Sequence, residues 1–437
     1  MTDITTEKAR IGAPSAQPFI DGFTEEGENL SPVNTGTNTS TTSEQPSAGP
    51  LAGASAKSHS HGGGVGVPDS SRAGRLTSYN LEDFKALTGL EEDWRFTPLR
   101  RLRGLHSDAL TGAAPAVSVS APAGVTVETV GRDDHRIGSA GIPEDRVSAN
   151  AWGGFKEATV ITVPSETSLE SEITVTLTGA GTEAAAQHIV VVAEKFSKGV
   201  LVLGHEGSAV VSENVEIVLE DGAELTVVSL QEWNDDSVHA SSQQAKIGRD
   251  AKFKHIVVSL GGDLVRVTPT ARFAAPGGEV ELFGLYFADA GQHLEHRTFV
   301  DHGQANCVSN VLYKGALQGK GAHTVWVGDV LIQKNAEGTD SYEKNQNLVL
   351  TDGCRADSVP NLEIETGLIA GAGHASATGR FDDEHLFYLM ARGIPEEVAR
   401  RLVVRGFLNE IIQKINVPAI EDRLTDAVER ELAATEN

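Results

Sequence analysis

The sequence is poor in the residues that mark a disulfide framework or a small zinc module. Of its 437 residues only two are cysteines, Cys307 and Cys354, and no Cys-x-x-Cys pair occurs. This excludes a disulfide-stabilised scaffold and a closed structural zinc site of the usual spacing. Aromatic residues make up only 5% of the chain, whereas glycine occurs 46 times. That balance favours a core of small and β-branched residues in regular layers over one built on large rings.

Long apolar runs and positive charge are also scarce. The longest apolar stretches, such as 189–193, are far too short to cross a bilayer. The segment after Met1 has neither the basic nor the apolar part of a secretory signal, so a cytoplasmic protein with reduced thiols is predicted. The formal net charge is −25, and such a field repels nucleic-acid phosphates and anionic lipids. The sequence therefore predicts no nucleic-acid partner and no membrane partner.

Four regions follow one another along the chain. Residues 1–75 are rich in Ser, Thr, Gly, Pro and Ala and lack apolar periodicity, so a disordered tail is predicted. Residues 76–157 are predicted to form a helical and mixed region, because apolar residues recur at helical spacing after Asn80, a candidate helix N-cap. Residues 158–378 are predicted to form a β-helix core, and residues 379–437 a helical domain.

The third region alternates short strands rich in Val, Ile and Leu with turns that carry Gly, Asp or Ser. The turn residues Gly222, Asp250 and Gly278 follow one another at 28-residue intervals. Gly321 and Gly353 mark similar turns after a longer interval. A turn-and-strand unit with a period of 20–50 residues is typical of stacked repeats. The pattern predicts a mainly β protein built as a parallel β-helix, with a β-sandwich as the structural alternative.

The last region has helical patterning. A first helix is predicted over 382–392, capped by its first residue, and a second helix opens at Pro395 with an acidic first turn. A third covers about 420–433. Apolar residues such as Ile411 and Ile415 are predicted to remain exposed on these helices, where they would bind a partner.

A series of motifs in the second half of the chain occurs in a characteristic order. They are Gln292–Thr298, Val311–Gly315, Thr339–Leu348, Asp357–Ile364, Gly373–Arg380, Leu386–Ile394 and Arg405–Leu408. In this order they resemble the SufB/SufD family of iron–sulfur cluster assembly scaffolds. The resemblance covers more than a hundred residues and implies a right-handed parallel β-helix flanked by N-terminal and C-terminal helical regions.

The resemblance also implies a role within a complex rather than an enzymatic activity. The segment Trp94–Leu99 is similar to the start of SufD, and the chain lacks the extra cysteines of SufB, so a SufD-like subunit is favoured. Such a subunit pairs with a SufB-like sister subunit, and each binds a SufC-like ABC-type ATPase. The chain itself contains no GxxxxGK[ST] phosphate loop, so ATP hydrolysis would belong to that partner. Whether the isolated chain forms a homodimer is left open.

Two residues are candidate ligands for iron or a nascent iron–sulfur cluster. His374 lies in the family's Gly-His-Ala segment, and a neutral imidazole binds Fe²⁺ well; the alternative is a histidine that only hydrogen-bonds across the last coil. Cys354 lies where SufB has a cluster cysteine, but a lone cysteine among strands is also often a small buried apolar residue. Ala375 stands where SufB has a glutamate, which argues against a cluster held by this subunit alone. A transient cluster shared with a partner is therefore predicted, with none bound permanently.

Other polar residues are predicted to have no role in the site. His293 and His296 would point to opposite faces of a strand, because side chains alternate with a period of two. Together with His302 and Cys307 they form a series of possible metal ligands. The four residues are predicted to be surface and turn residues instead. Four carboxylates are predicted to be solvated turn or rim charges: Asp340, Glu343, Glu363 and Glu365.

Two other functions are alternatives to cluster assembly. One is a purely structural interaction subunit, whose helical end would be its only working part. The other is a carbohydrate-active enzyme, since β-helices commonly cleave acidic polysaccharides. The missing secretory signal and the acidic net charge disfavour that enzyme, because an acidic surface repels an acidic substrate.

Overall fold

A computed structural model of the protein describes residues 74–107, 109–381 and 383–434. The predicted disordered tail lies outside these residues, except for Gly74 and Arg75. Arg75 belongs to the folded part, because its guanidinium donates a hydrogen bond to Asp93 at 2.9 Å. The predicted domain boundaries stay predictions, but the structure shows where each helix and strand begins and ends.

The described part of the chain is mainly β, with short helices before and after the strands. It begins with two 3-10 helices, Leu81–Asp83 and Leu99–Leu102. The remaining elements in chain order are β1 Ala116–Ser120, β2 Thr126–Gly131, α1 Arg146–Gly154, β3 Glu157–Val163, β4 Ile173–Ala193, β5 Lys198–Leu219, β6 Glu224–Trp233, β7 Val238–Ile247, β8 Lys252–Ser259, β9 Leu264–Phe273, β10 Glu279–Ala288, β11 His293–His302, β12 Val308–Leu317, β13 His323–Ile332, β14 Asp340–Val349, β15 Arg355–Ile364, β16 Gly371–Arg380, α2 Asp383–Ala391, α3 Glu396–Ile412 and α4 Pro418–Ala434.

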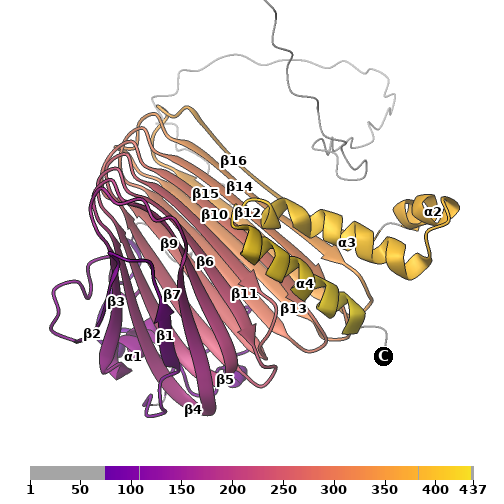
Figure 1. Ribbon diagram of the computed structural model, residues 1–437, viewed down its shortest axis with the longest axis horizontal. Coiled ribbons are helices and arrows are strands. Elements are labelled where there is room, and N and C mark those ends of the chain that lie inside the picture. Colours follow the sequence, from indigo (N-terminus) through magenta and orange to yellow (C-terminus); the bar gives the residue numbers. More distant parts are fainter. Residues whose placement is uncertain (1–73, 108, 382, 435–437) are drawn as a thin grey trace, which may run out of the picture. The chain divides into compact units, whose positions relative to one another are not determined.

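The strands form two facing rows that are joined through β5. One row runs β5-β6-β8-β10-β12-β14-β16 and the other β5-β7-β9-β11-β13-β15 (Figure 1). Within each row the neighbouring strands are parallel and in register, as Glu279 and Val308 show at the start of β10 and β12. Each coil therefore adds one strand to each row, as in a parallel β-helix. That predicted fold is confirmed, and the sandwich alternative is wrong because no two neighbours in the rows are antiparallel hairpin partners.

One row of turns is held by residues with left-handed backbone conformations. Gly222 has φ 69° and Asp250 has φ 52°, and each donates its backbone N–H to a carbonyl of the next coil, at 2.8 and 3.2 Å. The next such residue is Gly277 rather than the predicted Gly278. Among the described residues the row comprises Glu166, Phe196, Gly222, Asp250, Gly277, Asn306 and Gly338. Gly321 and Gly353 also have positive φ but belong to the turns at the opposite edge, which explains their irregular interval.

The interior of the β-helix contains a row of polar and small side chains. It follows the register from His205 on β5 to Thr378 on β16, through Gln231, Ser259, Tyr286, Gly315 and Asn347. The Tyr286 hydroxyl donates a hydrogen bond to Asn347 at 2.6 Å. Gly315 makes room for the Tyr286 ring, since a Cβ there would overlap it. Buried polar groups are paired along this row, as a dry interior requires.

The N-terminal region differs from the predicted helix. Asn80 does cap a helix and accepts a hydrogen bond from Glu82 N, but that helix is a single 3-10 turn. It ends early because Glu91 accepts hydrogen bonds from the backbone of Thr88 and Gly89, which holds this segment in a turn. The sequence analysis missed α1, whose capping box uses Ser148 in place of the usual glutamate.

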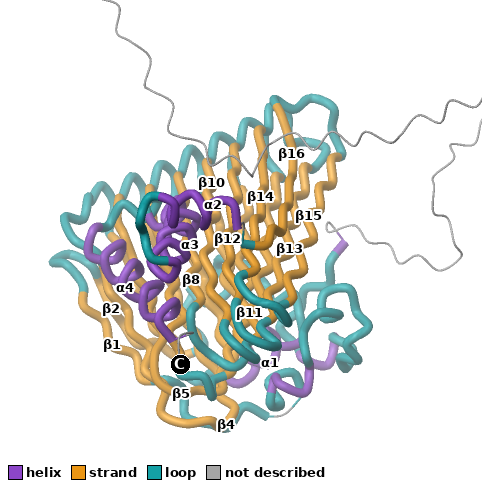
Figure 2. Tube along the Cα trace, turned by 90° about the vertical axis from the view of Figure 1, so that its right-hand side faces the viewer, coloured by secondary structure: helices purple, strands orange, loops and turns teal. Residues whose placement is uncertain are grey.

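Helices α3 and α4 cover the outer face of the row that contains β8, β10 and β12, whereas α2 packs against α3 and projects away from the sheet (Figures 1 and 2). Ile411 and Ile415 are buried there against strand residues such as Phe283. Their predicted exposure is therefore wrong, since both point toward the sheet. The predicted cap residue at position 382 lies outside the described residues. Pro395 is the N-cap of α3 rather than its first helical residue, so the helix begins one residue later than predicted, at Glu396.

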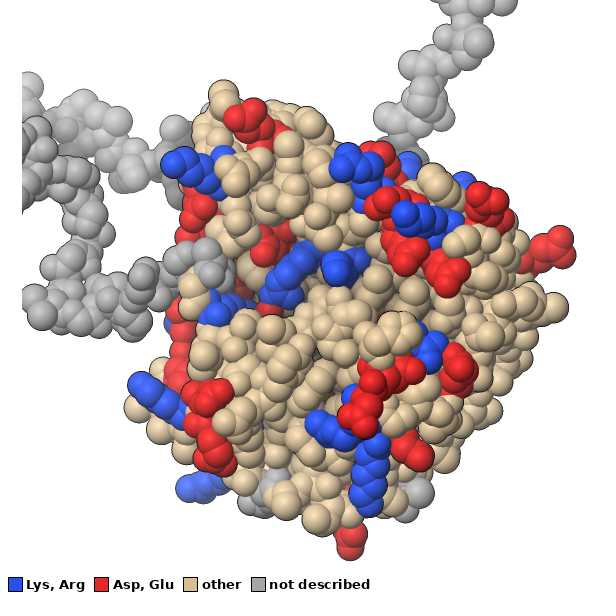
Figure 3. All heavy atoms as spheres, turned by 90° about the vertical axis from the view of Figure 1, so that its left-hand side faces the viewer, with Lys and Arg blue, Asp and Glu red and all other residues tan. Residues whose placement is uncertain are grey.

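Acidic and basic side chains are interspersed on the face seen in Figure 3. Several lysines lie beside carboxylates of the next coil, as Lys198 does with Glu224 at 2.9 Å and Lys252 with Glu279 at 3.3 Å. Such cross-strand pairs offset the repulsion that stacked like charges would cause. Among the described residues no helix has the length and apolar character needed to span a membrane.

Buried neutral histidines are expected to make the fold sensitive to acid. Burial lowers the pKa of His255, His296 and His302 to about 3. The unfolded chain takes up protons as the pH falls through about 6.5, whereas the folded chain does not, so the free energy of unfolding falls between pH 6.5 and 3. Each histidine contributes up to about 1.4 kcal/mol per pH unit.

Denaturant titrations at pH 7.5, 6.0 and 5.0 measure this slope. The His255→Gln variant is expected to lose stability less steeply on acidification than the wild type. The control is His135→Gln, because the His135 side chain is 89% exposed. An identical pH slope in His255→Gln and the wild type would contradict the prediction.

Candidate functional site

The last coil of the β-helix is its open end. Strands β15 and β16 are the final strands of the two rows, and among the described residues no other strand pairs with their outer edges. Nearly all residues of β15 are half-exposed, and most of β16 is exposed. Unpaired backbone N–H and C=O groups on such edges are a template for another strand.

His374 lies on β16 at this open end and, like Ala372 two residues before it, points to the interior of the β-helix. It pairs in register with Glu343 of β14, and its Nδ1 lies 3.8 Å from Oε1 of Glu343. The imidazole is 45% exposed, whereas the Glu343 side chain is completely buried. A solvent-accessible imidazole nitrogen thus lies directly over a buried carboxylate.

The prediction that Glu343 is a solvated rim charge is wrong. Its side chain points inward, toward Gly328 on the facing row, and neither carboxylate oxygen makes a hydrogen bond of normal geometry to a described residue. Burial, reinforced by the nearby Asp329 carboxylate, raises the pKa of Glu343 to about 8. A buried carboxylate without hydrogen-bond donors is costly unless it is protonated or binds a cation. Sequence reasoning missed it because only the register with His374 shows which way it points.

Asp329 contributes a second unusual carboxylate close by. Burial raises its pKa to about 6, although the guanidinium groups of Arg75 and Arg297 act in the opposite direction. It accepts a hydrogen bond from Asn361 at 2.8 Å. Asp329 lies on the outer side of its row, because the neighbouring Trp326 and Val330 point into the core.

Cys354 is not brought next to His374. It lies in the turn before β15, where its Sγ is 3.2 Å from the carbonyl oxygen of Gly319. The same turn contains Asp352, which pairs with Arg380 at the end of β16 at 2.8 Å. His374 lies six residues before Arg380, which at about 3.3 Å per residue separates the two candidates by about 20 Å. Cys354 is half-buried against the core, so the geometry fits the small-residue alternative.

The histidine series on β11 is buried and does not form a single site. His293 and His296 point to opposite faces, as predicted, but the expectation that they are surface residues is wrong. His293 lies on the outer face, where its Nε2 is 3.1 Å from Oε2 of Glu295. His296 lies in the interior, where its Nε2 is hydrogen-bonded to the hydroxyl of Ser259. His302 also points inward and bonds Ser309. Cys307 is a buried core residue, and burial raises its pKa.

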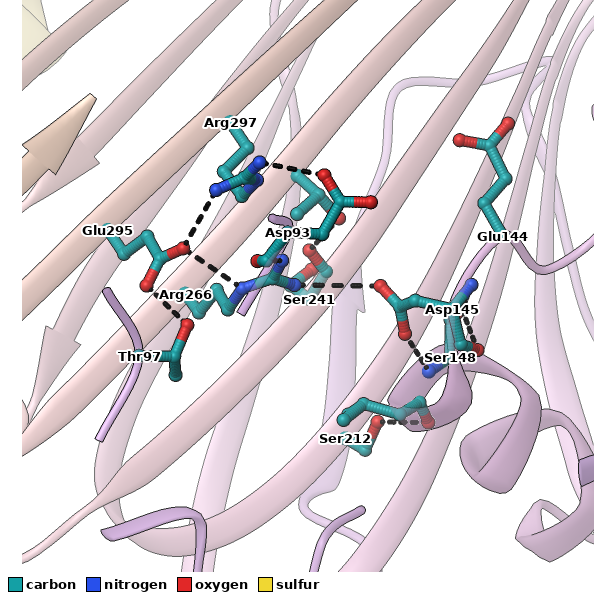
Figure 4. A network of polar contacts seen from close by, with 12 residues as sticks. Asp93, Thr97, Glu144, Asp145, Ser148, Ser212, Ser241, Arg266, Glu295 and Arg297 are labelled. Atoms are coloured by element: carbon teal, nitrogen blue, oxygen red, sulfur yellow. Dashed lines mark hydrogen bonds and ion pairs between the residues drawn. The ribbon is translucent and has the colours of Figure 1, made fainter. Parts of the chain in front are cut away.

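The segment Trp94–Leu99 packs on the outer face of β9 and β11 through a polar network (Figure 4). Thr97 donates a hydrogen bond to Glu295 at 2.7 Å, and Arg266 stacks on the Trp94 ring at 3.9 Å. Arg297 joins Asp93 at 2.8 Å. The motifs Trp94–Leu99 and Gln292–Thr298, which are distant along the chain, therefore contact each other in the fold.

Comparison with known families agrees with this architecture. A family model described as SUF system FeS cluster assembly, SufBD core domain, matches residues 175–407, which is more than half of the chain. The chain belongs to the SufB/SufD family. The match includes both His374 and Glu343 and ends within α3.

Several mycobacterial proteins of this family are similar to the chain. An iron–sulfur cluster assembly SufBD family protein of Mycobacterium bovis is 55% identical over 371 residues, which cover 83% of this chain and 93% of the relative. One from Mycobacterium leprae is 54% identical over 373 residues, covering 83% and 95%. A second protein of that description from M. leprae is 27% identical over 201 residues, covering 46% and 23%. This one organism therefore has two SufBD family proteins that differ strongly in their similarity to this chain.

Proposed function

We propose that the chain is the SufD-like subunit of a cytoplasmic SufBCD-type complex that assembles iron–sulfur clusters. In this role it is a scaffold without catalytic activity, and it helps to acquire iron at its interface with a SufB-like sister subunit. The proposal rests on His374 at the open end, whose Nδ1 lies 3.8 Å from the buried Glu343 carboxylate, a group that accepts no hydrogen bond of normal geometry from the described residues. Imidazole nitrogen and carboxylate oxygen both suit Fe²⁺. Two ligands leave room for others from the sister subunit.

The unpaired edges of β15 and β16 support pairing with that sister subunit. An added strand would satisfy the free backbone groups and would cover His374 from the open side. The presence of two SufBD family proteins in M. leprae agrees with a pair of different subunits. A partner at this edge would also bring its own ligands to iron.

The edge interface is tested by a charge on β16. Ala375 is exposed on that strand and is paired with Lys344 of β14, so Ala375→Lys places a second ammonium group beside the first. The wild-type chain, co-expressed with a SufB-like subunit and a SufC-like ATPase, is expected to purify as one complex. Ala375→Lys is expected to lower recovery of the sister subunit at least about tenfold, because like charges at a strand edge oppose pairing.

The matched control is Thr129→Lys, which adds the same charge to an exposed position on β2, far from the open end in the strand order. Circular dichroism establishes that both variants fold. Equal recovery of the sister subunit with Ala375→Lys and Thr129→Lys would exclude the β16 edge as the interface. A wild-type chain that never co-purifies with either partner would contradict the proposed complex itself.

The C-terminal helices offer a separate surface for the ATPase. Phe387 is 73% exposed on α2, and Val398 and Leu402 are exposed on α3. These side chains face away from the sheet that Ile411 covers. They are the apolar groups that a docking partner would bury, in place of the residues expected from the sequence.

A purely structural interaction subunit is the second candidate function. The half-buried position of Cys354 agrees with it, because that thiol is remote from His374. Under this alternative, the edge strands and the helices would bind partners and His374 would have no ligand role. Iron loading of the complex separates the two functions.

A further inference from the structure

A second group of histidine and carboxylate side chains lies deep inside the β-helix. His205 and Glu213 are on β5 and His239 is on β7, and none of the three is more than 1% exposed. Strand β5 pairs with β6 at His205 and with β7 at Glu213, so the group joins the two rows across the interior. One ligand atom from each residue lies within 4.8 Å of the others. We refer to these three residues as the inner triad.

Hydrogen bonds on the far side of each ring fix the two imidazoles. Nδ1 of His205 lies 2.9 Å from the carbonyl oxygen of Leu230, which can only accept, so this nitrogen donates. Nδ1 of His239 lies 2.7 Å from Oε1 of Gln231, whose amide nitrogen donates in turn to Ser229. With Nδ1 held behind the ring, each imidazole directs Nε2 into the triad. Histidines that ligate metals are held in the same way, by an acceptor behind the ring.

The Glu213 carboxylate faces both imidazoles. Its Oε2 lies 3.3 Å from Nε2 of His205 and 3.3 Å from Nε2 of His239. Nε2 of His239 makes no hydrogen bond of normal geometry to a described residue. Both separations are long for a hydrogen bond between an imidazolium and a carboxylate, which is typically about 2.7–2.9 Å.

One hydroxyl group also contacts the Glu213 carboxylate. Ser241 donates one hydrogen bond to Glu213 at 2.7 Å and accepts one from Gln243. A buried carboxylate that faces two imidazole nitrogens, with both rings held from behind, is a suitable place for a cation.

We propose that His205, Glu213 and His239 bind one divalent transition-metal ion, Zn²⁺ or Fe²⁺. Two imidazole nitrogens and one carboxylate oxygen are a ligand set that both ions accept. Bonds of about 2.0–2.1 Å in a tetrahedron place neighbouring ligand atoms about 3.3 Å apart, which matches the two separations to Glu213. The ion would link the two rows of strands near the start of the β-helix.

This site is separate from the proposed iron site at the open end. Six strand-to-strand steps, from β5 to β16, lie between them, which at about 4.8 Å per step is about 29 Å. The inner triad is also enclosed, whereas His374 reaches solvent. Metal would enter the triad as the coils close, so binding would be coupled to folding.

Refolding with a single metal tests the proposal. The full-length chain is unfolded in a chelator and refolded with Zn²⁺ alone, or with Fe²⁺ alone under anaerobic conditions. It is then desalted, and the metal per folded chain is measured. The wild type and His374→Ala are both expected to retain about one equivalent that Glu213→Gln lacks. The matched control is His255→Gln, which alters a buried histidine of the next coil that faces no carboxylate.

Trp233 provides a local signal for occupation of the triad. Its ring packs against both His205 and His239, with centroids 5.4 Å apart in each case. Co²⁺ bound at the triad is expected to quench the Trp233 fluorescence, and the quenching should disappear in Trp233→Phe. A folded wild-type chain without retained Zn²⁺ or Fe²⁺ would overturn the proposal, whether or not Glu213→Gln folds. So would equal metal content in the wild type and Glu213→Gln.

Discussion

Replacing His374 by alanine is expected to lower iron loading of the reconstituted complex by about tenfold or more. The loss follows because His374, the proposed iron ligand, is the solvent-accessible nitrogen above Glu343, and changes at a metal site commonly cost 10–100-fold in affinity. Glu343→Gln is expected to reduce loading as well, since an amide oxygen carries no charge. Iron and acid-labile sulfide per complex, measured after anaerobic reconstitution, give the result.

Stability measurements separate a ligand role from a structural one. His374 is 45% exposed, so His374→Ala removes little buried volume and should leave the free energy of unfolding nearly unchanged. Glu343→Gln should leave the free energy of unfolding nearly unchanged near pH 7, because a pKa of about 8 keeps Glu343 mostly protonated there and the amide replaces one neutral group by another. His135→Ala is the exposed control, and Cys354→Ser should change loading no more than about twofold, given its distance of about 20 Å from His374. Equal cluster yield in the wild type and His374→Ala would refute the ligand role.

Deleting the residues after Gly393 is expected to prevent the β-helix from folding. Helices α3 and α4 bury apolar side chains against β8, β10 and β12, and each is worth about 1.5–3 kcal/mol. Their sum is comparable with the whole stability of a domain, about 5–15 kcal/mol. The deletion would also leave buried Lys314 without its hydrogen bond to the carbonyl of Phe407, at 3.3 Å. Size-exclusion chromatography and circular dichroism are expected to show an aggregated chain with altered β structure.

Substitutions on the outer surface of the same helices should behave differently. Phe387→Ser combined with Leu402→Ser changes only exposed side chains, so the chain should fold as the wild type does. Binding of the SufC-like ATPase should nevertheless fall by about tenfold or more, because hot-spot side chains of this kind contribute about 1–2 kcal/mol each. A soluble, monomeric truncated chain with native circular dichroism would contradict the folding prediction. Full ATPase affinity in the double variant would contradict the docking surface.

The repeat and the family were accessible from the sequence because both depend on local order along the chain. Turn residues such as Gly222 and Asp250 must adopt positive φ in every coil, so their spacing is visible as a period. The period failed at Gly321 because two rows of turns alternate, and the sequence does not say to which row a glycine belongs. The family motifs are likewise contiguous and could be read in order.

Burial on the outer faces was decided only by the tertiary structure. Alternation along a strand shows which residues share a face, but it does not show whether another element covers that face. Ile411 was therefore expected to be exposed, although it packs on the sheet. His293 was expected at the surface, although it is buried beside Glu295, which accepts a hydrogen bond from Thr97 of the N-terminal segment.

The sequence by itself determined the β-helix, its flanking helices, the family and His374 as the candidate ligand. The tertiary structure added Glu343, removed Cys354 from the neighbourhood of His374 and brought together the inner triad. All three results depend on which residues of neighbouring coils lie in register and on where the two facing rows of strands come together. Such contacts are set by how the coils stack, and no spacing within one strand specifies them.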